Sequence, residues 1–111
     1  MDDALNTRIE NLKKYLLDDP NDSFLRYALA IELFKNNELP ESQRIFENLI
    51  IDNPEYLATY YQYGKFLEEI EDFAKATMVY ETGIKIAEKQ NNMRTVKELK
   101  EALRSVRDLE E

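Results

Sequence analysis

The chain has 111 residues, enough for one domain with a modest hydrophobic core. Its 15 Lys and Arg residues against 23 Asp and Glu give a net charge of -8, so we expect neither nucleic acid nor a membrane surface as a partner. The absence of Cys and His excludes disulfides, thiolate nucleophiles, imidazole bases and the usual zinc ligands. Two glycines and three prolines favour long helices joined by short loops over a sheet with many turns.

We expect neither a signal peptide nor a membrane-spanning segment. The first residues, Met-Asp-Asp-Ala-Leu-Asn, lack the basic and apolar regions of a signal peptide. No apolar run approaches the roughly 20 residues that a membrane helix needs. We therefore expect a cytoplasmic protein.

The first predicted helix covers about residues 5–16, where apolar residues recur at steps of four, three and four and so share one face. It should end before Pro20, because proline disfavours helical geometry in the residue that precedes it. Asp22 is typical of the N-cap of a second helix, over about 23–36. That helix is apolar on more than one side, so it must be covered on two faces or expose an apolar strip to a partner.

Four further helices are predicted in the rest of the chain. The third covers about 40–52 and begins at Pro40, a favourable first helical residue. Asn53 is expected to cap a fourth helix over about 54–69, and Asp72 a fifth over about 73–88. The sixth runs to about residue 109 and carries one apolar face, formed by Val96, Leu99, Leu103 and Val106. Six helices and no strand predict an all-α fold.

A shift of 34 residues aligns the sequence with itself. Identical residues then coincide at several positions, including the pairs Pro20 with Pro54, Tyr27 with Tyr61, Leu33 with Leu67, Glu47 with Glu81 and Ile50 with Ile84. A helix-turn-helix unit that recurs at this period indicates a repeat array, in which each unit buries its apolar faces against its neighbours.

The two units resemble the tetratricopeptide repeat. The residues that carry the resemblance are Leu29, Ala30, Leu33, Ser42, Phe46 and Pro54 in the first unit and Tyr63, Gly64, Leu67, Ala76 and Tyr80 in the second. Arg26 and Glu88 depart from the pattern, which has a bulky aromatic and a proline there. Paired helices should approach most closely at the small residues Ala30, Gly64, Ser42 and Ala76.

The resemblance covers about residues 20–88 and implies an all-α, right-handed helical-repeat array of about six antiparallel helices. One domain over residues 1–111 would comprise an N-terminal packing helix (1–19), two full repeats (20–53 and 54–88) and a C-terminal capping helix (89–111). The whole chain is also similar to small bacterial proteins of this family.

In this family the first helix of each repeat lines a concave groove that binds a peptide or helix of another protein. The resemblance places eight candidate residues there: Phe24, Tyr27, Ile31, Phe34, Lys35, Tyr61, Lys65 and Glu68. Rigid aromatic rings suit such a groove because they supply contact area at low entropic cost. The alternative is that a flanking helix covers Phe24, Tyr27, Ile31 and Phe34 and makes them core.

Two other functions compete with this interaction module, for which we expect no catalytic residue, cofactor or metal. The first is self-assembly, as a homodimer formed through the ends of the array or through the apolar face of the sixth helix. The second is catalysis or cation binding by carboxylates. The best acidic group matches no calcium-binding loop and is interpreted as a solvated turn with a helix cap; it consists of Glu68, Glu69, Glu71 and Asp72.

Overall fold

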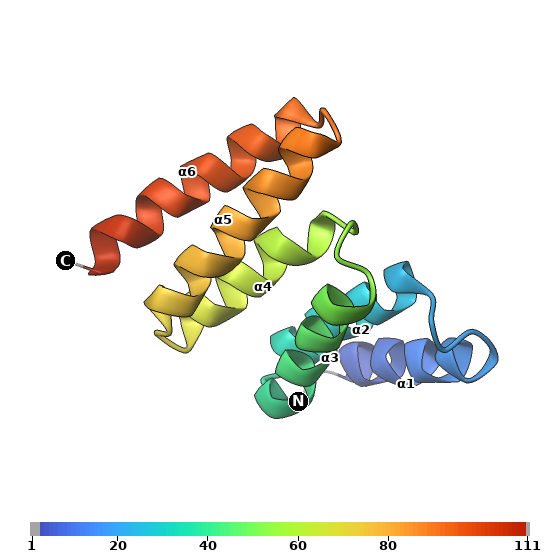
Figure 1. The fold of residues 1–111 in the computed structure, drawn as a ribbon. Helices are drawn as coiled ribbons and strands as arrows, with labels where there is room; N and C mark the ends of the chain where they lie inside the picture. The colour runs from blue at the N-terminus through green and yellow to red at the C-terminus, as the bar shows by residue number, and fades with distance from the viewer. Residues whose placement is uncertain (1–2, 111) are drawn as a thin grey trace. The chain divides into compact units, whose positions relative to one another are not determined.

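The computed structural model describes residues 3–110, which form six α-helices and no strand (Figure 1). Helix α1 spans Asp3–Asp18, α2 Ser23–Lys35, α3 Leu39–Asp52, α4 Ala58–Glu69, α5 Phe73–Lys89 and α6 Met93–Glu110. The predicted all-α fold is confirmed. No helix in this range is long and apolar enough to cross a membrane. The outermost residues of the predicted segments 1–19 and 89–111 (1, 2 and 111) lie outside the described residues.

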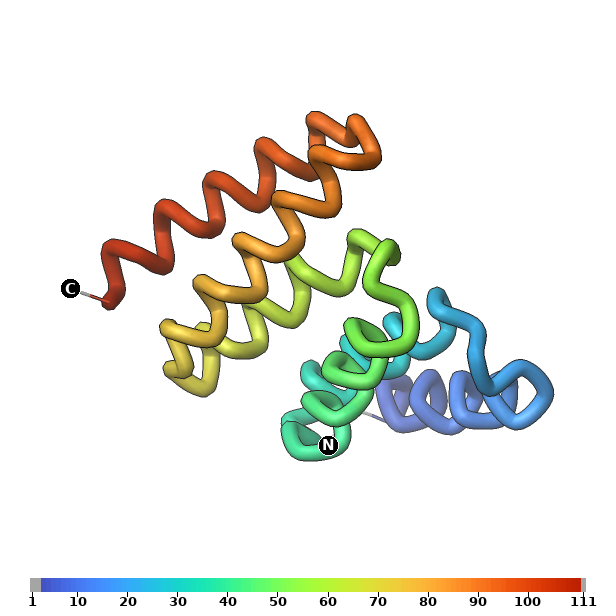
Figure 2. Tube along the Cα trace, in the orientation of Figure 1, coloured from blue at the N-terminus to red at the C-terminus, as the bar shows by residue number. Residues whose placement is uncertain are grey.

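The chain divides into two compact units, one that ends at Tyr56 and one that begins at Leu57. The first unit contains α1, α2 and α3, and the second contains α4, α5 and α6. Within the second unit the chain reverses after α5, and α6 returns along it (Figure 2).

In the first unit, α1 and α2 share an apolar core. Leu5 and Ile9 of α1 are buried against Leu29 and Leu33 of α2, and the partly buried Leu12, Leu16 and Ile45 extend this cluster. The apolar stripe predicted for the first helix is therefore the face that the helix buries. Such burial is what stabilises α1, because isolated helices of this length are marginal in water.

Helices α2 and α3 meet at two small residues. Ala30 and Ser42 are fully buried, and the Ser42 hydroxyl donates a hydrogen bond of 2.7 Å to the Ala30 carbonyl. The bond satisfies a hydroxyl group whose burial would otherwise be costly. The predicted close approach of paired helices at these residues is confirmed.

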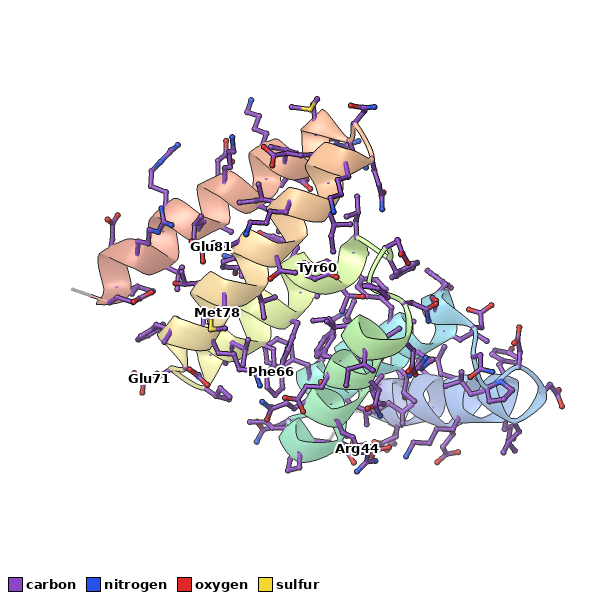
Figure 3. The ribbon with its side chains drawn as sticks, viewed as in Figure 1. Arg44, Tyr60, Phe66, Glu71, Met78 and Glu81 are labelled. Carbon is purple, nitrogen blue, oxygen red and sulfur yellow. The ribbon has the colours of Figure 1, made fainter. Side chains whose placement is uncertain are left out.

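Helices α4 and α5 each place a tyrosine ring against a glycine of the other. A Cβ atom at Gly64 of α4 would lie 2.0 Å from Cε1 of Tyr80, and one at Gly83 of α5 would lie 2.6 Å from Cβ of Tyr60. Both tyrosines are buried, and Figure 3 labels Tyr60 on α4. The crossed pairing shows that the helices run antiparallel. Gly64 was singled out from the sequence, whereas Gly83 lies outside the family pattern and was missed.

Helix α6 packs along α5 and also contacts α4. All four apolar residues of its predicted face are buried inside the second unit, namely Val96, Leu99, Leu103 and Val106. A homodimer that pairs through these side chains would first have to open this core. The fold therefore gives no support to that form of the self-assembly alternative.

Two of the three predicted helix caps are confirmed. The Asp22 carboxylate accepts a hydrogen bond of 2.8 Å from the Leu25 backbone N–H, and Asp72 accepts one of 3.2 Å from that of Lys75. Each bond satisfies an N–H group that the first helical turn leaves without a partner.

The prediction that Asn53 caps a fourth helix from residue 54 is wrong, because α4 begins at Ala58. Asn53 instead ends α3, where its N–H donates a hydrogen bond of 2.8 Å to the Leu49 carbonyl. A turn follows, closed by a 3.1 Å hydrogen bond from the Tyr56 N–H to the Asn53 carbonyl. Asparagine and proline are favoured at the first two positions of such a turn, so Pro54 belongs to the turn and not to the helix.

Three of the turns that end helices contain a residue with positive φ, namely Asn37 (59°), Glu71 (62°) and Asn91 (56°). At the second of these turns, the Asp72 N–H donates a hydrogen bond of 2.8 Å to the Leu67 carbonyl, which closes the end of α4. Asparagine tolerates this backbone conformation, whereas a glutamate in it costs roughly 1–2 kcal/mol.

We expect Glu71→Gly to raise the free energy of unfolding by about 0.5–1 kcal/mol, because glycine relieves the strain but adds freedom to the unfolded chain. Glu71 is exposed at the turn between α4 and α5 (Figure 3). Lys97→Gly, at an exposed position inside α6, is the control and should lower the same quantity by about 1 kcal/mol. Urea denaturation measures both, and a loss of stability in Glu71→Gly would contradict the positive φ.

Candidate functional site

The five candidate residues of α2 differ in exposure. Phe24 is 62% exposed, so the core alternative is wrong for this residue. Tyr27, Ile31 and Phe34 are partly buried, and the Tyr27 ring packs edge-on against Tyr56 at a centroid distance of 5.8 Å. Lys35 is exposed, and its ammonium group lies 3.8 Å from the Glu32 carboxylate. In the first unit, Phe24 thus presents the most accessible apolar surface of the five.

The candidate residues of α4 form a connected group in the second unit. The Lys65 Nζ lies 5.3 Å from the centroid of the Tyr61 ring and 3.6 Å from Oε2 of Glu68. The same Glu68 oxygen accepts a hydrogen bond from the Tyr80 hydroxyl. Burial raises the pKa of Tyr80, and this hydrogen bond raises it further. Glu68 is therefore held from two sides, and it orients Lys65 over Tyr61.

A hollow of about 330 Å³ opens beside this group, between α4 and α6. Tyr61 and Lys65 line one side of it, and the residues opposite are Glu98, Glu101, Ala102 and Ser105. The structure thus brings two of the predicted residues together with four that sequence reasoning missed. Their spacing in sequence places the four on one helical face, which is the signal that could have identified them.

A larger hollow of about 670 Å³ lies on the other side of α6, against α5. Ile84 and Leu103 contribute its apolar lining, and its remaining lining residues are charged. One of the charged pairs is an ion pair in which Arg107 Nη2 lies 2.9 Å from Glu81 Oε2. No candidate residue from the sequence lines this hollow.

The acidic turn after α4 does not form a metal site. Glu68 interacts with Lys65 and Tyr80, and Asp72 caps α5. Across residues 3–110, no three acidic side chains are close enough together to hold a metal ion.

The structure is similar to solved structures of bacterial proteins. A tetratricopeptide repeat domain protein from Salinibacter ruber, in a solution structure, is 33% identical with a TM-score of 0.78, covering 81% of this chain and 91% of its own. This chain belongs to the tetratricopeptide repeat family. A crystal structure of the Salinibacter ruber domain protein is also 33% identical, with a TM-score of 0.74 over 79% of this chain and 99% of its own.

A more distant tetratricopeptide-like fold is found in a protein from Bordetella parapertussis. It is 23% identical, with a TM-score of 0.77 over 90% of this chain and 87% of its own, and it supports the fold alone. No model of a protein family matches the sequence, and no curated protein matches it. Tetratricopeptide repeat arrays are in general non-catalytic scaffolds that bind other proteins, so the family indicates an interaction module.

Proposed function

We propose that the chain binds a segment of another protein and that the hollow between α4 and α6 is its principal contact site. The observation that carries the proposal is the exposed hollow lined by the Tyr61 ring and the oriented Lys65 side chain. The rigid Tyr61 ring offers contact area to a peptide at little cost in side-chain entropy. The Lys65 charge beside it, held in place by Glu68, favours one orientation of the bound peptide. We infer no catalytic step, since the lining offers no nucleophile activated by a neighbouring base.

Phe24 is a second candidate contact, which belongs to the first unit. Its side chain is large, apolar and mostly exposed. Burial of this side chain against a partner would lower the free energy of the complex. Phe24 and the hollow belong to different units, so each surface needs its own variant.

We expect Tyr61→Ala to weaken capture of the partner by about thirtyfold, which corresponds to roughly 2 kcal/mol for the loss of an aromatic anchor. The measurement is affinity capture from the native lysate, followed by titration of each captured protein against the purified variants. Phe24→Ser tests the first unit in the same way.

Met78→Ala is the matched control, because Met78 is 65% exposed on α5 and does not line the hollow. It should capture the same protein with unchanged affinity, and thermal unfolding should show that all variants remain folded. A partner that binds Tyr61→Ala as tightly as the unmodified chain would exclude the hollow as the principal contact.

A further inference from the structure

The hollow between α4 and α6 carries an excess of negative charge. Its charged lining residues are Lys65, Glu98 and Glu101. The ammonium group of Lys65 is already paired, at 3.6 Å, with the carboxylate of Glu68. The two α6 carboxylates therefore stand opposite a positive charge that is compensated from its own helix.

Glu98 and Glu101 have no compensating partner of their own. Both side chains are exposed, and within residues 3–110 neither forms an ion pair or a hydrogen bond. They are three positions apart on one helix, where like charges face each other and destabilise the helix by a few tenths of a kcal/mol, about 0.2–0.5. A cation placed between them would remove this repulsion.

No basic residue of α6 is paired with Glu98 or Glu101 within residues 3–110, although Arg94 and Lys97 stand one turn before them in the sequence. Lys100, Arg104 and Arg107 line the other hollow, on the α5 side of the helix, and Arg107 is paired there with Glu81. These three cations of α6 therefore lie away from Glu98 and Glu101. The net charge of -8 adds a long-range attraction for positive ligands.

Two further lining residues of the hollow also suit a long cationic side chain. Tyr61 contributes an aromatic ring and Ala102 a small apolar surface, on which the methylene stem of lysine or arginine can pack. The Lys65 ammonium group already lies 5.3 Å from the ring centroid, so the ring serves the incoming side chain as packing surface for its stem. The ring and Ala102 match the apolar stem of such a side chain, and the two unpaired carboxylates match its charge.

We propose that the occupant of this hollow is a lysine or arginine side chain from a peptide segment of the partner, held between Glu98 and Glu101 over Tyr61. The inference rests on the proposed function, and it gives that function a chemical class of partner. It assigns Glu98 and Glu101 as the residues that make the hollow prefer a positively charged side chain of the peptide.

The test uses three short fluorescent peptides that differ only at two positions, which carry arginine, glutamine or glutamate. Each peptide is titrated by fluorescence anisotropy into the unmodified chain and into Glu98→Gln/Glu101→Gln. Glu69→Gln/Glu71→Gln is the matched control, because it removes the same charge from exposed positions outside the hollow. The backbone amide signals of Ala102 and Ser105, followed by NMR, report whether a peptide enters the hollow.

The arginine peptide should bind the unmodified chain and the control with affinities within about twofold, and the hollow variant about tenfold more weakly. Its binding should weaken as salt is added, and it should shift the Ala102 and Ser105 signals. Equal loss in both double variants would mean that only the net charge matters, which would overturn the inference.

Equally tight binding of the glutamine or glutamate peptide in the hollow would also overturn the inference, while leaving the proposed function intact. Failure of the arginine peptide to bind would overturn it as well. The proposed function is decided separately by Tyr61→Ala, which keeps both carboxylates in place.

Discussion

Replacing Gly64 by valine should lower the free energy of unfolding by about 2–3 kcal/mol, at the upper end of the cost of overpacking a core. A Cβ atom at this position would lie 2.0 Å from Cε1 and 2.4 Å from Cζ of Tyr80. The tyrosine ring is fully buried, and its hydroxyl is hydrogen-bonded to Glu68, so it cannot move aside without losing that bond. The clash exceeds the few tenths of a kcal/mol, about 0.4, that valine gains over glycine in helix propensity.

Urea denaturation of a double variant tests the cause of this loss. In a Tyr80→Leu background the same Gly64→Val change should cost much less, because the ring that it meets is gone. Glu69→Val, at an exposed position of α4, is the control and should change the stability by less than about 0.5 kcal/mol. Equal costs of Gly64→Val in both backgrounds would show that the contact with Tyr80 is not the cause.

Leu33→Ala should lower the free energy of unfolding of the first unit by about 3 kcal/mol, within the usual range for a buried leucine. Leu33 is fully buried and belongs to the cluster that joins α1 to α2. Part of this cost is the favourable free energy of moving the leucine side chain out of water, which alanine mostly lacks. The rest comes from the cavity that the smaller side chain leaves. A unit of this size has little stability to spare, so the loss should be visible in its local opening.

Hydrogen exchange resolved by residue measures this effect, since it reports α1, α2 and α3 separately from the second unit. The amides of these three helices should exchange faster in Leu33→Ala. Leu17→Ala is the matched control, because Leu17 is 82% exposed and the same truncation should change stability by less than about 0.5 kcal/mol. If these amides were as well protected from exchange in Leu33→Ala as in the unmodified chain, Leu33 would not stabilise the packing of α1 on α2.

Much of the fold could be predicted because the signals are local. The apolar stripe of α1 and the caps Asp22 and Asp72 depend on residues within one or two turns of each other. The error at Asn53 arose because an Asn-Pro pair is compatible with both a helix start and a turn. Only the hydrogen bond from Asn53 to Leu49 shows that the residue ends α3.

The candidate site was predicted only in part, because the last helix was interpreted as a cap beyond the two repeats and not as one side of the groove. The buried residues of α6 do not follow those of α4 by 34 residues but by 36, which pairs Tyr60 with Val96, Tyr63 with Leu99 and Leu67 with Leu103. Extending the 34-residue period would therefore rotate α6 and place buried side chains on its open face. Tyr61 and Lys65 were predicted from the family pattern, which covers about residues 20–88 and so leaves out Glu98 and Glu101.

The sequence by itself determined that the chain is helical, where most helices lie and that they form a 34-residue repeat, because periodicity and turn chemistry act over a few residues. The tertiary structure alone decided that Phe24 is exposed and that Gly83 receives Tyr60. It also decided which face of α6 lies opposite Tyr61. These features depend on how helices rotate and approach each other, which is set by contacts between residues far apart in the chain.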